Sequence, residues 1–211
     1  MPSRPAGESQ RPGVRRGGAQ YERIHGDLAR AAAAALARRG YGDLSPEAVA
    51  SEAGVSPRTA FRHYPTKLDL ALAGIDALPD YSGWLEEVVA GESMADRLRR
   101  GLLVGAGHDE LLAPVMATCL SHRDEQPELL LQLRRRVLKP RERAIGAFLE
   151  EGKVRGEIRE AVGSTAMSAL DVGLFMMGGL GQFPLGRGRR RAQRLFEQIW
   201  PVICAPGHED D

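Results

Sequence analysis

Residues that can read the edges of nucleic-acid bases lie together in one short segment. Arg58 can donate two hydrogen bonds to a guanine, and Thr59 can touch a thymine methyl group or bind a phosphate. Ser56 and Pro57 precede them, a pair typical of a helix N-terminus because serine caps the helix and proline fits its first turn. Backbone N–H groups at such a helix start suit a phosphate or a base edge. The pattern predicts a short helix whose first turn can bind nucleic acid.

Two short helices are needed to hold this first turn outward. One begins at Ser45-Pro46 and ends at Gly54, and the next begins at Ser56-Pro57 and ends near Tyr64. Gly54 tolerates the positive φ of a tight turn, and Val55 supplies the buried apolar residue that follows it. The spacing indicates a helix-turn-helix, although a helix pair with an Ala-Gly turn also occurs in ordinary helical bundles.

The segment closely resembles the N-terminal DNA-binding domain of the TetR/AcrR family of bacterial transcriptional regulators. The resemblance covers about residues 21–70. The matching residues are Gly40, Tyr41, Val49, Ala50, Ala53, Gly54, Val55, Ser56, Thr59, Phe61, His63, Tyr64, Lys67 and Leu68.

The resemblance also implies roles for individual side chains. Lys67 would bind a backbone phosphate at the start of a fourth helix, whereas His63 and Tyr64 would support the backbone or pack against the first helix. Phe61 departs from the family, which often has a phosphate-binding tyrosine there, so Phe61 is expected only to pack. Glu47 would repel phosphate, and is expected to turn away from DNA or to accept from a cytosine amino group. The full set expected at the DNA is Ser45, Ser56, Pro57, Arg58, Thr59, Phe61, Arg62, His63, Tyr64 and Lys67. A solvated charge explains Arg62 equally well.

Hydrophobic periodicity predicts helices along the rest of the chain. After a first helix that ends at Gly40, the expected ranges are 46–53, 57–64, 66–78, 94–103, 110–120, 127–152, 162–180 and 189–203. No segment shows the alternation of a strand. The predicted fold class is therefore all-α, with about nine helices. It combines an N-terminal three-helix helix-turn-helix DNA-binding domain with a larger helical bundle for ligand binding and dimerisation.

Domain boundaries follow from these helices. Residues 20–65 are expected to form the DNA-binding domain and residues 66–205 the effector-binding and dimerisation domain, between a flexible basic arm (1–19) and a flexible tail (206–211). The first 70 residues carry eleven basic and seven acidic side chains, while the whole chain of 211 residues has a net charge of +1. Such asymmetry is expected when only one part of a chain meets a polyanion. The arm itself could attract phosphates or the minor groove.

By the resemblance, the last two long helices would form a homodimer. The residues expected at this contact are Leu170, Leu174, Phe175, Met177, Phe196, Ile199 and Trp200. The segment 162–180 is apolar nearly all round, which is typical of a helix covered on more than one side. An ordinary core within one chain explains each single residue nearly as well. A twofold dimer would suit a palindromic operator.

An effector pocket is expected between the fourth and eighth helices. Its candidate residues are Trp84, Met94, Leu98, Met116, Leu120, His122 and Met176. Methionine adapts to varied ligands but is also a common core filler. Ligand binding would favour a state in which the fourth helix, 66–78, swings and misplaces the recognition helices.

Enzymatic and membrane functions find little support in the sequence. It has no GxSxG, HExxH or P-loop motif and no complete GxGxxG, and its two cysteines form no metal-binding pair, so neither cofactor nor metal is expected. No run of eighteen apolar residues predicts a membrane span, and the start lacks the apolar region of a signal peptide, so a cytoplasmic location is expected. The expected partners are a double-stranded DNA operator, a small effector and a second copy of the chain. The sequence favours a transcriptional regulator, most simply a repressor, over a helical ligand-binding or interaction protein without sequence-specific DNA binding.

Overall fold

Every regular element in the described part of the chain is helical. The computed structural model describes residues 13–80, 91–105, 109–179 and 188–208. Their elements are α1 (Gly13–Arg39), α2 (Pro46–Glu52), α3 (Pro57–His63), α4 (Lys67–Asp76), α6 (Met94–Gly105), α7 (Asp109–Ser121), α8 (Pro127–Leu133), the π-helical η1 (Arg134–Leu138), α9 (Lys139–Val154), α10 (Ser164–Gly179) and α11 (Gly188–Ile203). Because α8, η1 and α9 are continuous, these ranges contain nine helical segments, and the predicted all-α class is confirmed.

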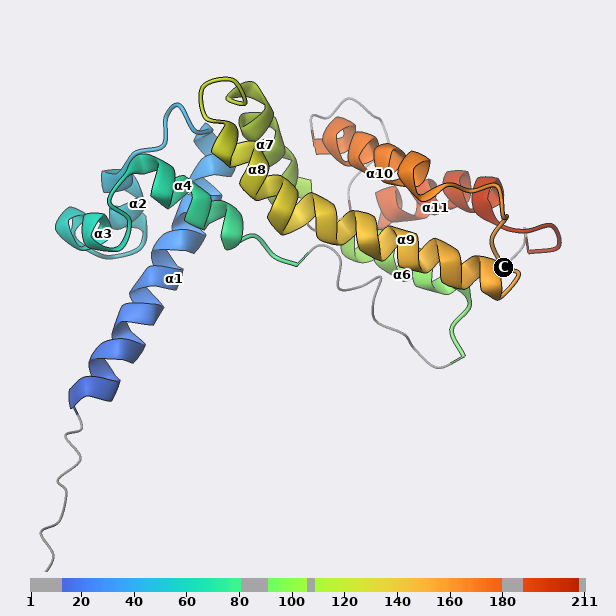
Figure 1. The fold of residues 1–211 in the computed structure, drawn as a ribbon, viewed down its shortest axis with the longest axis horizontal. Helices are drawn as coiled ribbons and strands as arrows, with labels where there is room; N and C mark the ends of the chain where they lie inside the picture. The colour runs from blue at the N-terminus through green and yellow to red at the C-terminus, as the bar shows by residue number, and fades with distance from the viewer. Residues whose placement is uncertain (1–12, 81–90, 106–108, 180–187, 209–211) are drawn as a thin grey trace, which may run out of the picture.

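The molecule is elongated, with two helical groups at its ends (Figure 1). Helices α2, α3 and α4 surround the C-terminal half of α1 at one end, whereas α6, α9, α10 and α11 form the other. Helices α7 and α8 lie between the two groups. Among the described helices, none combines the length and the apolar character that a bilayer crossing requires.

Hydroxyl caps define where α2, α3 and α4 begin. Ser45, Ser56 and Thr66 each accept a hydrogen bond from a backbone N–H in the first turn that follows. Thr66 and Asp69 complete a reciprocal capping box at the start of α4. Between α2 and α3, Gly54 has a φ of 69°, a value that a residue with a β-carbon rarely adopts. These local signals place α3 directly after a tight turn, as the sequence predicts.

Helix α1 begins earlier than its apolar pattern suggests. It starts at Gly13, so residues 13–19, which were expected to belong to a flexible arm, are helical. The side chains of residues 18–23 are exposed, and therefore no core is needed to hold this part in place. Extending a helix that the core has already nucleated costs little, because each added residue gains one backbone hydrogen bond.

Small residues let α1 and α4 approach each other closely. Leu28 of α1 and Leu70 of α4 are fully buried in the same core. Where the helices cross, a β-carbon on Gly74 would lie 2.9 Å from the backbone nitrogen of Ala33 and 3.0 Å from the backbone carbonyl carbon of Ala32. A side chain at position 74 would therefore push the two helices apart.

A second core joins α6, α9 and α11. Phe196, Ile199 and Trp200 are 5%, 9% and 1% exposed, and they pack in this core together with residues of α6 and α9. The three side chains predicted as dimer contacts are therefore core residues of their own chain. The apolar face of α11 is real, but α6 and α9 of the same chain already cover it.

In contrast to α11, helix α10 is only partly covered by its own chain. None of its described side chains, residues 164–174, is fully buried, and Leu170 is 48% exposed. Leu174 is half-buried against the second core. The side chains of Phe175 and Met177 lie outside the described residues. An apolar helix that its own chain leaves half-covered offers a surface for another molecule.

A π-helical turn interrupts the long helix just before Pro140. Proline has no N–H and its ring crowds the carbonyl four residues earlier, which here belongs to Arg136. The wider turn η1 ends at Leu138, just before the proline, and the α-helix resumes at Lys139. Such single π turns inside α-helices often occur at functional positions.

Candidate nucleic-acid interface

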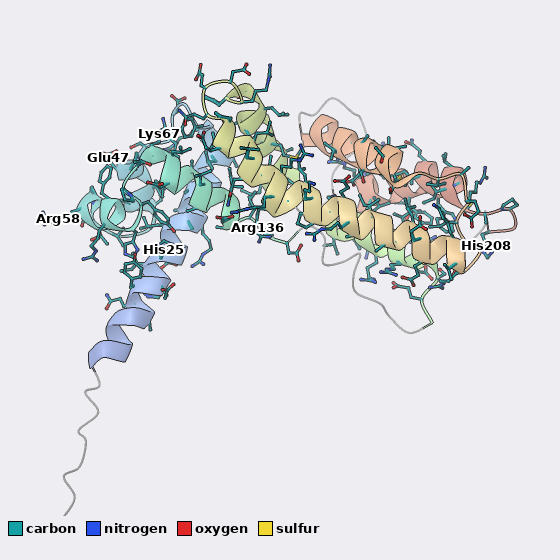
Figure 2. The ribbon with its side chains drawn as sticks, in the orientation of Figure 1. His25, Glu47, Arg58, Lys67, Arg136 and His208 are labelled. Atoms are coloured by element: carbon teal, nitrogen blue, oxygen red, sulfur yellow. The ribbon has the colours of Figure 1, made fainter. Side chains whose placement is uncertain are left out.

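Helix α3 presents one face to solvent and the other to α1. Arg58, Phe61 and Arg62 are exposed, whereas Ala60 and His63 are buried. Figure 2 shows Arg58 at the outer end of this group of helices, directed away from the rest of the molecule. The first turn of α3 is therefore open to a duplex, which the helix-turn-helix prediction requires.

The backbone at the start of α3 contributes less than predicted. The Ser56 hydroxyl accepts from the Thr59 N–H at 3.1 Å and lies 2.9 Å from the Thr59 hydroxyl. Pro57 has no N–H to offer. Because the cap occupies the N–H of Thr59, the expectation that Ser56 and Pro57 free this turn's N–H groups for a phosphate is corrected. The Arg58 side chain is the main donor that this turn presents.

Two other predicted residues hold neighbouring elements in place. Ser45 caps α2 by accepting from the Ala48 N–H at 3.2 Å, and it donates to the Glu47 carboxylate at 2.9 Å. Glu47 thus lies back against its own cap. The Lys67 ammonium donates to the Gly42 carbonyl at 2.6 Å, at the connection between α1 and α2. This contact keeps the ammonium beside the start of α4.

His63 and Tyr64 fasten α3 to α1. The His63 Nδ1 lies 3.4 Å from the His25 Nδ1, and the ring of Tyr21 stacks on His63 with 4.1 Å between centroids. The Tyr64 hydroxyl donates to the His25 carbonyl at 3.1 Å. His63 and Tyr64 are each 7% exposed, so they pack against α1 and position α3, which is the role that the resemblance implied for them. His25 was missed because it lies 38 residues from His63 in the sequence.

Burial also changes the acid–base behaviour of His63. Desolvation lowers the pKa of His63 below its ordinary value of 6.5, and the nearby His25 and Arg62 lower this pKa further. The Nε2 atom of His63 is shielded from solvent and has no hydrogen-bond partner. A second proton on this ring would have no acceptor, and the folded chain therefore favours neutral His63.

Acidification is expected to weaken the junction between α1 and α3. Because the folded chain resists protonation of His63 while the unfolded chain accepts it near pH 6.5, the free energy of unfolding should fall as the pH drops below that value. Urea unfolding at about pH 7.5 and about pH 5.5, on either side of the ordinary histidine pKa, measures this change. A His63→Phe variant should lose part of the pH dependence. An identical dependence in that variant would assign the effect to other groups.

Comparison with known proteins agrees with this geometry. Residues 28–73 match the family model for bacterial regulatory proteins of the tetR family. The N-terminal domain belongs to the TetR family. The match begins within α1 and ends in α4, and it contains the whole helix-turn-helix. No curated protein sequence matches the chain significantly.

Solved structures extend the likeness beyond the TetR-family domain. A protein from Rhodococcus sp. assigned to the TetR-family transcriptional regulators is 20% identical, with a TM-score of 0.64 over 85% of this chain and 99% of its own. A protein from Mesorhizobium loti with the same assignment is 19% identical, with a TM-score of 0.61 over 88% and 99%. The flavonoid-responsive regulator FrrA is 20% identical, with a TM-score of 0.55 over 88% and 99%. At these identities the likeness shows the fold.

Hydrogen bonds from α8 and η1 to the end of α4, here called the clamp, connect the TetR-family domain to the rest of the chain. The Arg136 guanidinium donates from Nε to the Asp76 carbonyl at 3.1 Å and from Nη2 to the Leu78 carbonyl at 2.9 Å. Gln132 donates to the Asp76 side chain. These bonds hold the C-terminal end of α4, whose other end begins at Lys67 beside α3. No sequence signal marked this clamp, because its partners are separated by 56 to 60 residues.

The described residues predicted for an effector pocket are divided between two cores and the surface. Met94 and Leu98 are buried in the second core, whereas Met116 is buried in the core shared with α1. Leu120 is 38% exposed, and His122 lies edge-on to the Tyr41 ring, 5.4 Å between centroids. Trp84 and the side chain of Met176 lie outside the described residues. Met94, Leu98 and Met116 are therefore core residues, and Met116 lies in a different core from Met94 and Leu98.

A hollow of about 470 Å³ lies between α9 and α10 instead. Apolar Leu138, Ile145 and Val172 line it together with the ion pair of Arg141 and Asp171. The Arg141 Nη2 donates to the Asp171 carboxylate at 2.7 Å. This combination of an apolar wall and a partly buried ion pair is the type of surface that small-molecule sites use. Among the described residues, no three His, Cys, Asp or Glu side chains gather to hold a metal ion.

Proposed function

We propose that this protein is a TetR-type transcriptional repressor that binds a palindromic DNA operator as a homodimer and is released by a small, mainly apolar effector. The observation that carries the proposal is the exposed face of α3, with Arg58 at the outer end of a domain that matches the TetR family. A helix-turn-helix places the first turn of its second helix in the major groove, where arginine can bind guanine through two hydrogen bonds.

The exposed face of α10 supports the homodimer. Thr165, Ala166, Ala169, Leu170 and Gly173 are all exposed and recur at helical spacing on one face. Small side chains beside a leucine allow two helices to approach closely, as in the packing of helical bundles. A twofold contact along this face would bring two recognition helices to one duplex, and half-sites about 34–36 Å apart would fit two successive major-groove turns.

The clamp on α4 supports release by an effector. Arg136 and Gln132 belong to the same continuous helix as α9, which lines the hollow beside α10. A ligand that displaces this helix would pull on the end of α4 through the Arg136 hydrogen bonds, and α4 begins next to α3. An apolar hollow suits an effector with a mainly apolar body, and FrrA, which shares the fold, is a flavonoid-responsive regulator.

Selection of bound sequences from random duplex DNA tests the proposal. The purified full chain is expected to enrich a palindrome whose half-sites are about one helical turn apart. Binding should weaken steeply as salt rises, because binding to phosphates releases counterions. Enrichment of no sequence would instead favour a helical ligand-binding or interaction protein in which the helix-turn-helix serves only packing.

Substitutions at two cations should affect recognition in different ways. Arg58→Ala is expected to lower affinity for the selected operator about tenfold or more and to relax the preference for one base pair, because one good bidentate contact contributes about 1–3 kcal/mol of discrimination. Lys67→Ala is expected to weaken binding to all duplexes alike and to reduce the salt slope by about one, since one phosphate would no longer be neutralised. Binding isotherms on the operator and on a scrambled duplex at several salt concentrations distinguish the two outcomes. Equal losses on both duplexes for Arg58→Ala would remove it from base recognition.

A further inference from the structure

Phe61 lies on the outer face of the recognition helix α3. From the resemblance it was expected only to pack, yet its side chain is 41% exposed. It follows Arg58 by three residues and precedes Arg62 by one, so all three side chains share the outer face of α3. The residues of this helix that do pack inward, Ala60 and His63, lie on the opposite face.

A phenyl ring at this position restricts what can lie against it. Unlike tyrosine, it has no hydroxyl and can form no ordinary hydrogen bond to a phosphate oxygen. Burying its apolar surface is favourable by itself, so an apolar partner would stabilise a complex. The thymine C5-methyl is the apolar group that base pairs display in the major groove, and phenylalanine is among the side chains suited to contact it.

The geometry points to a specificity role: we propose that Phe61 contacts the methyl group of a thymine in each operator half-site, next to the base pair read by Arg58. This inference rests on the proposed function, because it requires α3 to lie in the major groove. Arg58 and Phe61 are exposed on the same face of α3, and a contact of the Arg58 guanidinium with a base would bring the ring to the floor of the groove. Phe61 then selects thymine over cytosine by its methyl group and not by a hydrogen bond.

Replacing thymine by deoxyuridine tests this directly, because the exchange removes the methyl group and leaves the base-pairing hydrogen bonds intact. In the duplex that the full chain enriches, each thymine is exchanged in turn and the affinity is measured. One thymine per half-site is expected to matter, with about a fourfold loss of affinity for each methyl removed, the value of burying one such group. Exchange in both half-sites should cost about fifteenfold.

Two variants connect this effect to Phe61. A Phe61→Ala protein should bind the thymine and deoxyuridine duplexes equally, since the partner of the methyl group is gone. An Arg62→Ala protein, changed at the neighbouring exposed position, should bind both more weakly but keep the fourfold difference. Circular dichroism checks that both variants retain their helices.

The remaining outcomes separate this inference from the proposed function. If a palindrome is enriched but no deoxyuridine exchange changes affinity, or if the difference persists in Phe61→Ala, the role of Phe61 is overturned while the regulator stands. If no sequence is enriched at all, the proposed function itself fails and the inference fails with it.

Discussion

A Leu170→Glu variant is expected to be monomeric and to bind the operator about 100-fold more weakly than the native chain, or worse. Leu170 is 48% exposed at the centre of the small and apolar face of α10. In the proposed dimer, two copies of the new carboxylate would lie close together and away from water, which is costly for unpaired charges. Losing the second recognition helix removes the gain from binding two half-sites through one assembly, a gain of about 10² to 10⁴.

Val154→Glu provides a matched control for this change. Val154 is 89% exposed at the end of α9, so the substitution makes the same exchange of an exposed apolar side chain for a carboxylate outside the α10 face. This control is expected to remain dimeric with native affinity. Sedimentation equilibrium and operator titrations measure both properties. A dimeric Leu170→Glu protein with unchanged affinity would show that the chain associates through another surface.

A Gly74→Ala variant is expected to lose about 2 kcal/mol or more of unfolding free energy, although alanine is the better helix former. The added β-carbon would lie 2.9 Å from the Ala33 nitrogen and 3.0 Å from the Ala32 carbonyl carbon, which are backbone atoms of α1. A flexible side chain could rotate away from the added β-carbon, but the backbone of α1 cannot. Helices α1 and α4 must therefore move apart along the core that they share. The resulting shift would also misalign α3, which α1 holds through His25 and Tyr64.

The corresponding change in α9 should have the opposite sign. A β-carbon on Gly146 would meet only the Ser164 β-carbon at 3.9 Å, an ordinary van der Waals distance. Gly146→Ala is therefore expected to raise the unfolding free energy by about 0.5–1 kcal/mol through helix propensity. Urea unfolding of the two variants and the native chain measures the difference. A stabilised Gly74→Ala protein would mean that α1 and α4 are less tightly packed than described.

The helix-turn-helix follows from local chemistry and could be predicted closely. Ser56 and Pro57 start α3, Gly54 makes the turn before it, and the capping box of Thr66 and Asp69 starts α4. Each of these signals acts within a few residues of chain and depends little on what packs against it. The prediction that α3 presents Arg58 outward holds for the same reason, since the apolar spacing leaves only one face for solvent.

Contacts between distant residues could not be predicted, and several corrections come from them. The 38 residues between His25 and His63 contain no pattern that would bring the two rings together. The same holds for Arg136 and the end of α4, because hydrogen bonds to backbone carbonyls require no particular residue at the acceptor position. Where a side chain makes its bonds in this protein is fixed by how the helices cross, and crossing angles follow from the complete packing surface.

Helices α10 and α11 show that the sequence predicts an apolar helix face but not what covers that face. It determined that α10 and α11 are helices and that each has an apolar face, because periodicity records which positions avoid water. Only the tertiary structure decided that α6 and α9 cover Trp200 while Leu170 stays open. Burial against one's own chain and burial against a partner remove the same water from the same side chains, so both leave the same pattern in the sequence.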